Sequence, residues 1–115
     1  MMPLDPGKML DRIRLQKAGE YDPWLGQTYE TIGEFWTEFR PASGREFRDG
    51  SVIIGEERAT FAVNYREGLR QVDRIVHLGR GGGRVWDIKS VAPFGFKDGL
   101  LLMAVANDSV PPEAV

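Results

Sequence analysis

Short segments in which apolar and polar residues alternate, separated by turns rich in glycine and proline, are the feature that most constrains this chain. The clearest segment is ATFAVNYR at 59–66, where Phe61, Val63 and Tyr65 fall on one face. A period of two places successive side chains on opposite faces of a β-strand. No long stretch keeps the 3.6-residue period of an amphipathic helix. The sequence therefore predicts an all-β fold.

Six such segments are predicted as strands. They cover residues 11–17, about 27–40, 59–66, 72–78, 84–91 and 100–106. The predicted connections between them, apart from a longer segment after the second strand, cover residues 18–26, 67–71, 79–83 and 92–99. Because exposed strand edges promote aggregation, six short strands are expected to curl into a small β-barrel or sandwich.

The chain has 115 residues, a length that fits one domain. We expect a flexible N-terminal arm at 1–9, a β-barrel domain at 10–108 and a disordered tail at 109–115. The first ten residues lack the basic and then apolar layout of a secretory signal, which favours synthesis in the cytosol.

The second predicted strand ends unusually. Phe35 and Phe39 share one face, and Gly33 predicts an irregularity in the pairing. Pro41 lacks a backbone donor and is expected to end the ladder or mark a sheet edge. The following segment, 43–58, is long for a connection in so small a domain, and such loops are usually functional or disordered.

The residue inventory excludes several kinds of chemical site. The chain has no cysteine and a single histidine, so thiolate metal sites, disulfides and paired-imidazole sites are impossible. GRGGGR at 79–84 lacks the Lys-Ser/Thr of a Walker loop and the helix of a dinucleotide site, so a tight turn is favoured. No nucleophile stands beside a base in any recognisable pattern, and we predict no catalytic, cofactor-binding or metal-binding residue.

Charge and aromatic residues point to contacts with proteins. The net charge of −2 argues against a protein whose main task is to coat phosphates. The 11 arginines against 4 lysines fit an assembly protein or the codon usage of a GC-rich genome. Trp24, in a turn with proline and glycine, is predicted as an exposed anchor, whereas Trp36 is expected at a partly exposed rim and Trp86 in the core.

The single histidine, His77, is expected to be half-buried and structural. Asp73 and Asp87 are its candidate acidic neighbours.

The order of the motifs resembles the phage head-tail joining proteins, also called head-tail adaptors, stoppers or head-closure proteins of tailed bacteriophages and gene transfer agents. The resemblance covers roughly residues 8–108. Its most specific pieces are the two runs Trp36…Pro41…Ser43-Gly44-Arg45-Glu46 and Arg74-Ile75…Gly79…Trp86-Asp87-Ile88. The chain departs from the family in two places: FRDGSVIIGEE (47–57) is glycine-interrupted where the family often has a helix-like stretch, and Tyr65-Arg66 reverses the family's Arg-Tyr order.

The resemblance implies a structural virion neck protein without catalysis or cofactor, assembled in the bacterial host cytoplasm. It implies a cyclic ring of roughly six or twelve copies of this chain between a portal-side adaptor protein and a tail terminator or tail tube protein. Genomic double-stranded DNA would pass non-specifically through the ring, and in some members a loop between the second and third strands closes the channel.

Two groups of residues follow from this resemblance as hypotheses. The channel or gating loop would comprise Gly50, Ser51, Val52, Ile53, Ile54, Gly55, Glu56 and Glu57. The interface with other subunits or partners would comprise Trp24, Arg40, Ser43, Gly44, Arg45, Glu46 and Phe47.

Three alternatives remain open at this point, and one of them is a small-barrel enzyme or ligand binder, for which the sequence shows no polar constellation. The apolar residues 52–54 could simply cover the open end of the barrel rather than gate a channel. The whole chain could instead be a small β-barrel that binds single-stranded nucleic acid through stacked aromatic residues and a basic groove, although the acidic balance disfavours it.

Overall fold

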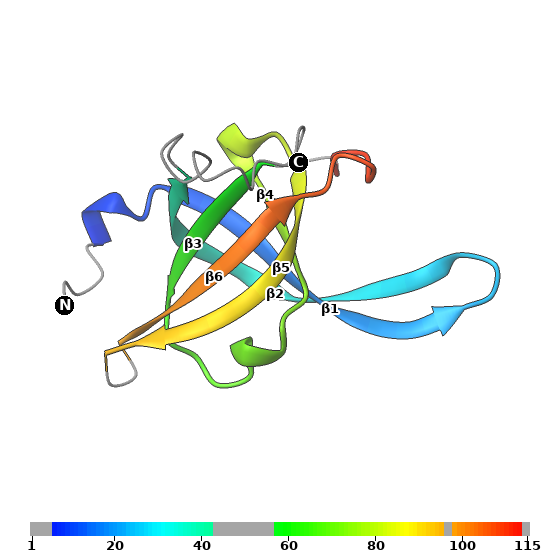
Figure 1. Ribbon diagram of the computed structural model, residues 1–115, viewed down its shortest axis with the longest axis horizontal. Coiled ribbons are helices and arrows are strands. Elements are labelled where there is room, and N and C mark those ends of the chain that lie inside the picture. The colour runs from blue at the N-terminus through cyan, green and yellow to red at the C-terminus, as the bar shows by residue number, and fades with distance from the viewer. Residues whose placement is uncertain (1–5, 43–56, 96–97, 114–115) are drawn as a thin grey trace, which may run out of the picture.

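Six antiparallel strands close into a barrel in the order β1-β2-β3-β6-β5-β4 (Figure 1). We describe residues 6–42, 57–95 and 98–113 of a computed structural model. The strands are β1 (Asp11–Asp22), β2 (Gly26–Pro41), β3 (Arg58–Asn64), β4 (Arg74–His77), β5 (Arg84–Phe94) and β6 (Gly99–Ala106). Short 3-10 turns are η1 (Pro6–Lys8), η3 (Leu69–Gln71) and η4 (Gly79–Gly81). The predicted all-β class is confirmed, and no described helix is long and apolar enough to span a membrane.

The barrel interior is filled by the residues that the alternation places inward. Its largest fully buried side chains include Trp86, Phe61, Ile13, Leu15 and Leu102. Full burial of a large apolar side chain stabilises a fold by roughly 1.5–3 kcal/mol.

On β2, the face predicted from alternation is confirmed. Thr37 is fully buried, and its hydroxyl donates a hydrogen bond of 2.8 Å to the Ala62 carbonyl. Phe39 packs against the rings of Phe61 and Trp86, at centroid distances of 5.2 and 5.9 Å.

β1 and β2 extend beyond the barrel as a two-stranded ribbon, which we call the arm (residues 17–32). Figure 1 shows the arm projecting away from the barrel. β1 pairs with β4 only from Ile13 to Gln16, and β2 pairs with β3 only from Glu38 to Pro41, so the arm's strands pair with each other alone.

The prediction of a connection at 18–26 is therefore wrong, because only residues 23–25 lie between the strands. The pairing register shifts between Ala18 and Tyr21. There the Gln27 amide donates to the Gly19 carbonyl at 2.7 Å, and the Thr28 hydroxyl donates to the Glu20 carbonyl at 2.6 Å. Side chains thus satisfy backbone groups where the ladder is irregular. The irregularity predicted at Gly33 is confirmed by a second register shift, since Leu15 faces Gly33 and Gln16 faces Thr31.

One further sequence boundary needs correction. The predicted loop at 92–99 is shorter, because β5 runs to Phe94 and β6 begins at Gly99. Within the N-terminal arm expected at 1–9, residues 6–8 form a 3-10 turn that is followed by the buried Met9, and the flexibility of this arm stays a prediction.

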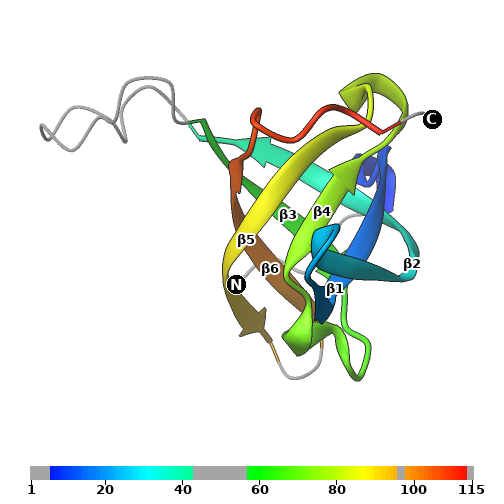
Figure 2. The same ribbon diagram turned by 90° about the vertical axis from the view of Figure 1, so that its right-hand side faces the viewer.

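The segment after β6 lies against the barrel as far as Glu113. The Glu113 amide donates to the Gly83 carbonyl at 3.0 Å, and the Asn107 amide donates to the Val85 carbonyl at 2.9 Å. Figure 2 shows this C-terminal segment, in red, crossing the ends of β4 and β5. The C-terminal segment therefore meets the turn between these strands, and the disorder expected at 109–115 stays a prediction.

Candidate functional site

The tip of the arm presents three large side chains to solvent. Trp24 is 93% exposed, Leu25 79% and Tyr21 70%. One Asp22 carboxylate oxygen accepts hydrogen bonds from the backbone amides of Trp24, at 2.7 Å, and Leu25, at 3.2 Å. This side-chain capping of the turn holds the backbone of both apolar residues in place. The predicted exposure of Trp24 is confirmed, and its role at an interface stays a prediction.

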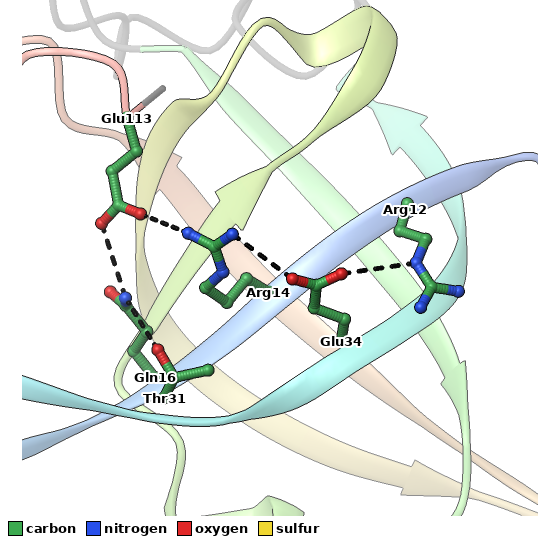
Figure 3. Close-up of polar contacts among 6 residues, drawn as sticks. All are labelled: Arg12, Arg14, Gln16, Thr31, Glu34 and Glu113. Atoms are coloured by element: carbon green, nitrogen blue, oxygen red, sulfur yellow. Dashed lines mark hydrogen bonds and ion pairs between the residues drawn. The ribbon is translucent and has the colours of Figure 1, made fainter. Parts of the chain in front are cut away.

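A polar network fixes the base of the arm to the barrel and to the tail (Figure 3). Arg14 contacts Glu113 at 2.6 Å and Glu34 at 3.3 Å, so its guanidinium joins β1, β2 and the C-terminal segment. The Gln16 amide donates to the Thr31 hydroxyl at 3.4 Å and to Glu113 at 3.5 Å. Single surface pairs stabilise little, but a shared network orients the groups that it connects.

A cation–π contact adds to the network at the same base. The Arg74 guanidinium on β4 lies 3.5 Å from the centre of the Tyr29 ring on β2. The arm is therefore held from the β4 side as well as through Arg14. Sequence reasoning missed this base, because its contacts join segments that are far apart in the chain.

His77 belongs to a buried cluster that the sequence did not indicate. Its Nε2 lies 2.5 Å from a carboxylate oxygen of Asp11, whose other oxygen accepts from Arg80 Nε at 2.8 Å. The Asp11 side chain is fully buried. Burial favours the neutral carboxyl, but the hydrogen bonds and charges of Arg80 and His77 outweigh it and hold the pKa of Asp11 below its usual value.

The residues considered as neighbours of His77 have other partners. Asp73 accepts from the Ala18 amide at 2.8 Å, and Asp87 accepts from the Asn107 side chain at 2.7 Å. His77 is 5% exposed, so it is more deeply buried than predicted. Since aromatic rings and a carboxylate surround it, its surroundings match a structural histidine.

The glycine-rich turn after β4 packs closely against its neighbours. A side chain at Gly81 would overlap the His77 ring, and one at Gly83 would overlap the Glu113 backbone. Gly83 also has a φ of 79°, in the left-handed region that favours glycine. The segment is a tight connection, as predicted, and close packing explains Gly81 and Gly83, whereas Gly79 and Gly82 have positive φ in open space.

Both roots of the predicted gating loop lie at one end of the barrel. Pro41 pairs opposite Ala59, and the Ala42 amide donates to the Arg58 carbonyl at 3.0 Å. β2 ends at Pro41, as predicted. A hollow of about 650 Å³ adjoins these roots and is lined by Arg40, Pro41, Ala42, Arg58 and Lys89 among others.

Only part of the predicted functional segment can be placed. Gly50–Glu56 of the gating loop lie outside the described residues, as do the interface candidates Ser43, Gly44, Arg45, Glu46 and Phe47. Glu57 is exposed and its carboxylate contacts the Arg84 guanidinium, while its carbonyl accepts from the Ala106 amide at 2.8 Å. Arg40 is exposed and contacts Glu38 on its own strand at 2.5 Å. Arg40 lies next to the end of β2 on the barrel, whereas Trp24 lies at the tip of the arm, so the two interface candidates do not form one patch.

A second hollow, which we call the seam groove, lies where β2 and β3 are not paired. Met9, Leu10, Trp36 and Asn64 line it, with a volume of about 530 Å³. Leu10 is 65% exposed and Trp36 is 54% exposed, as expected for a rim residue. Sequence reasoning missed this groove because Leu10 and Asn64 are far apart in the chain.

The chemistry of these surfaces suits binding to proteins. Among the described residues, no group of His, Cys, Asp or Glu is arranged to hold a metal ion. Many arginines of the described surface are paired with carboxylates rather than aligned in a basic groove: Arg12, Arg14, Arg40, Arg80 and Arg84. This pairing disfavours the nucleic-acid-binding alternative.

Comparison with known proteins gives one family and a shared fold. The family model described as phage head completion protein matches residues 4–106. The solution structure of protein SF1141 from Shigella flexneri 2a is similar, with a TM-score of 0.64 at 23% identity, over 90% of this chain and 97% of that chain. At this identity the likeness concerns the fold. No curated protein matches the sequence.

Proposed function

The chain belongs to the phage head completion protein family, and on that premise we propose that it forms a ring in the neck of a tailed phage. Membership makes it a structural protein of the head-tail junction that interacts with other head and tail proteins. It also confirms the resemblance drawn from the motifs. The proposed ring lies between the portal-side adaptor and the tail and continues the DNA channel, and the subunit has no catalytic role.

The family match over residues 4–106 is the observation that carries this proposal, because it spans the whole barrel and the connection between β2 and β3. The fold agrees with a ring subunit. In the closed barrel each strand pairs with two neighbours over part of its length, so we expect copies to associate mainly through side-chain surfaces or through the arm. A head-to-tail ring needs two different surfaces on each subunit, and the arm tip and the barrel wall are two such surfaces.

The connection between β2 and β3 is our candidate for the part that closes the channel. Its two roots are pinned side by side by the Ala42–Arg58 hydrogen bond, so the segment between them starts and ends at one point of the barrel. In a ring, symmetry would gather all copies of this point around one axis. The apolar sequence at 52–54 could then meet its copies across the channel.

Deleting residues 50–55 tests the gate against the alternative that this segment covers its own barrel. We expect the purified variant to keep its unfolding midpoint, whereas assembled heads that carry it release their DNA. A loss of several kcal/mol in the subunit's stability would instead assign residues 52–54 to the barrel core.

Removing the gene from the phage tests the neck function itself. We expect heads that fill with DNA but do not retain it, together with free tails, and complementation by the intact chain should restore infectious particles. Antibody labelling of mature particles should place the chain at the neck. Normal particles without the chain would contradict the proposal.

A further inference from the structure

We propose that the arm tip of one copy docks into the seam groove of the next copy. This inference rests on the proposed ring and names the two surfaces that join its subunits. The arm tip comprises Tyr21, Trp24 and Leu25, and the seam groove comprises Met9, Leu10, Trp36 and Asn64.

The arm tip has the properties of a binding anchor. Trp24 and Leu25 are more exposed than any other large apolar residue of the described chain. Their turn is held by Asp22, and the base of the arm is held by Arg14 and Arg74. Large aromatic side chains on a preorganised support lose little conformational freedom on binding, and they dominate the energetics of interfaces.

The seam groove has the shape and chemistry to receive that anchor. It arises because pairing of β2 with β3 starts at Glu38, opposite Ala62, which leaves the strands unpaired beyond this point. Its walls carry exposed apolar surface from Leu10 and Trp36. A neighbouring hollow of about 260 Å³ shares Trp36 and Asn64 with it and extends the groove along the seam.

The two surfaces lie at opposite ends of the molecule. The groove flanks the start of β1, where Arg12 pairs opposite Trp36, and the tip follows the end of the same strand. The twelve residues of β1 span about 40 Å at about 3.3 Å per residue, so the tip cannot reach the groove of its own chain. Figure 1 shows the arm and the N-terminal segment, in dark blue, on opposite sides of the barrel.

Charge complementarity favours a second copy as the occupant. The arm carries Glu20, Asp22 and Glu30 against the single cation Lys17. Two arginines and one glutamate, Arg12, Arg66 and Glu34, line the extension of the groove, and Glu34 pairs with Arg12, so this lining carries a net charge of +1. An acidic knob and a basic rim on opposite sides of one subunit attract each other between copies and orient the approach.

The absence of native cysteine makes disulfide trapping a direct test. Leu25→Cys and Leu10→Cys change exposed residues, so both variants should fold. A concentrated mixture of the two single variants should give a covalent heterodimer under mild oxidation, and the double variant should give a ladder or a closed ring. The matched control pairs Leu25→Cys with Met103→Cys, on β6, whose side chain is 41% exposed.

We expect the Leu10–Leu25 pair to react at least about tenfold faster than the control pair, and Trp24→Ala in the double variant to remove most of that advantage. Ile32 is an exposed residue of the arm outside the tip, and Ile32→Ala should leave the rate advantage of the Leu10–Leu25 pair unchanged. Equal rates for the two cysteine pairs, or no effect of Trp24→Ala, would overturn the inference.

The same variants in phage particles separate this inference from the proposed function. A disulfide between two copies of the chain in the particle supports docking of the tip into the groove. If the chain is present at the neck but Leu25→Cys is trapped on another virion protein by a cysteine there, the arm serves a different partner and the inference fails while the neck function stands. Absence of the chain from particles would refute the function instead.

Discussion

The arm continues two of the six barrel strands, yet apolar residues of the barrel and of the arm have opposite environments. In the barrel half of β1, Ile13 and Leu15 are fully buried. In the arm half, Tyr21 and the neighbouring Trp24 and Leu25 face solvent. Burial in the barrel stabilises the subunit, whereas the exposed side chains of the arm add little to its stability and leave apolar area for a partner to cover. The comparison separates residues that fold the chain from residues that assemble it.

The largest expected contrast is between two tryptophans. Trp86→Ala should lower the free energy of unfolding by about 3–5 kcal/mol, because it opens a cavity between Phe39 and Phe61. Trp24→Ala should change it by less than about 0.5 kcal/mol, since its side chain is 93% exposed. Chemical denaturation followed by circular dichroism measures both. A large loss of stability in Trp24→Ala would show that the arm tip packs within its own subunit.

The next effect concerns the buried Asp11 in the barrel wall. Asp11→Asn should destabilise the fold by about 1–3 kcal/mol, because His77 and Arg80 lose a charged acceptor.

The pH dependence of that loss has a definite sign. The pKa of Asp11 is lower in the folded chain than in the unfolded chain, so its ionised form adds stability above the unfolded value of about 4. That contribution is lost as the pH falls through the folded pKa. The gap between the parent and Asp11→Asn should therefore narrow in acid, and unfolding curves at pH 7 and pH 3 measure it. An equal or wider gap at pH 3 would contradict the assignment.

A smaller effect is expected where the tail meets the barrel. Gly83→Ala should cost about 1–2 kcal/mol, because φ is 79° and the added methyl group meets the Glu113 backbone. Hydrogen exchange of the Glu113 amide should accelerate, while the Phe61 amide should lose protection only in proportion to the overall loss of stability. Gly68→Ala is a matched control, since Gly68 also has positive φ but a methyl group added there would have no atom within 4 Å.

The smallest effect on stability is expected at the base of the arm. Glu34→Gln weakens the contacts with Arg12 and Arg14 and should cost less than about 1 kcal/mol. Instead, the arm should become more mobile, and the NMR order parameters at Trp24 should be lower than in the parent chain. Unchanged order parameters would show that the remaining contacts, Arg74 with Tyr29 and Gln16 with Thr31, are enough to hold the arm.

The barrel was largely predictable from the sequence, and the arm was not. Alternation identified the inward faces at Ile13, Leu15, Phe61 and Thr37, because a two-residue period leaves only one way to bury a strand. The arm has no such signal. Residues 18–22 contain glycine and polar side chains that read as a turn, and hydrogen bonds from Gln27 and Thr28 keep them in a strand.

The buried Asp11–His77 pair, the hollow beside Arg40 and the seam groove could not be predicted from the sequence either. Asp11 and His77 are 66 residues apart in the chain, and they meet because β1 pairs with β4. Proximity of this kind depends on barrel closure, which alternation does not encode. Trp24 could be anticipated, since a tryptophan in a proline-glycine turn has few ways to be buried.

One consequence follows from the closed barrel. In the described chain, the outer sides of the arm are sheet edges with no neighbouring strand, so this hairpin is able to extend a sheet. Intermolecular backbone pairing between crowded free subunits, including the kind that starts fibrils, should therefore begin there. A subunit trimmed at this hairpin should remain monodisperse at concentrations where the parent self-associates, which would make it the better sample for solution work.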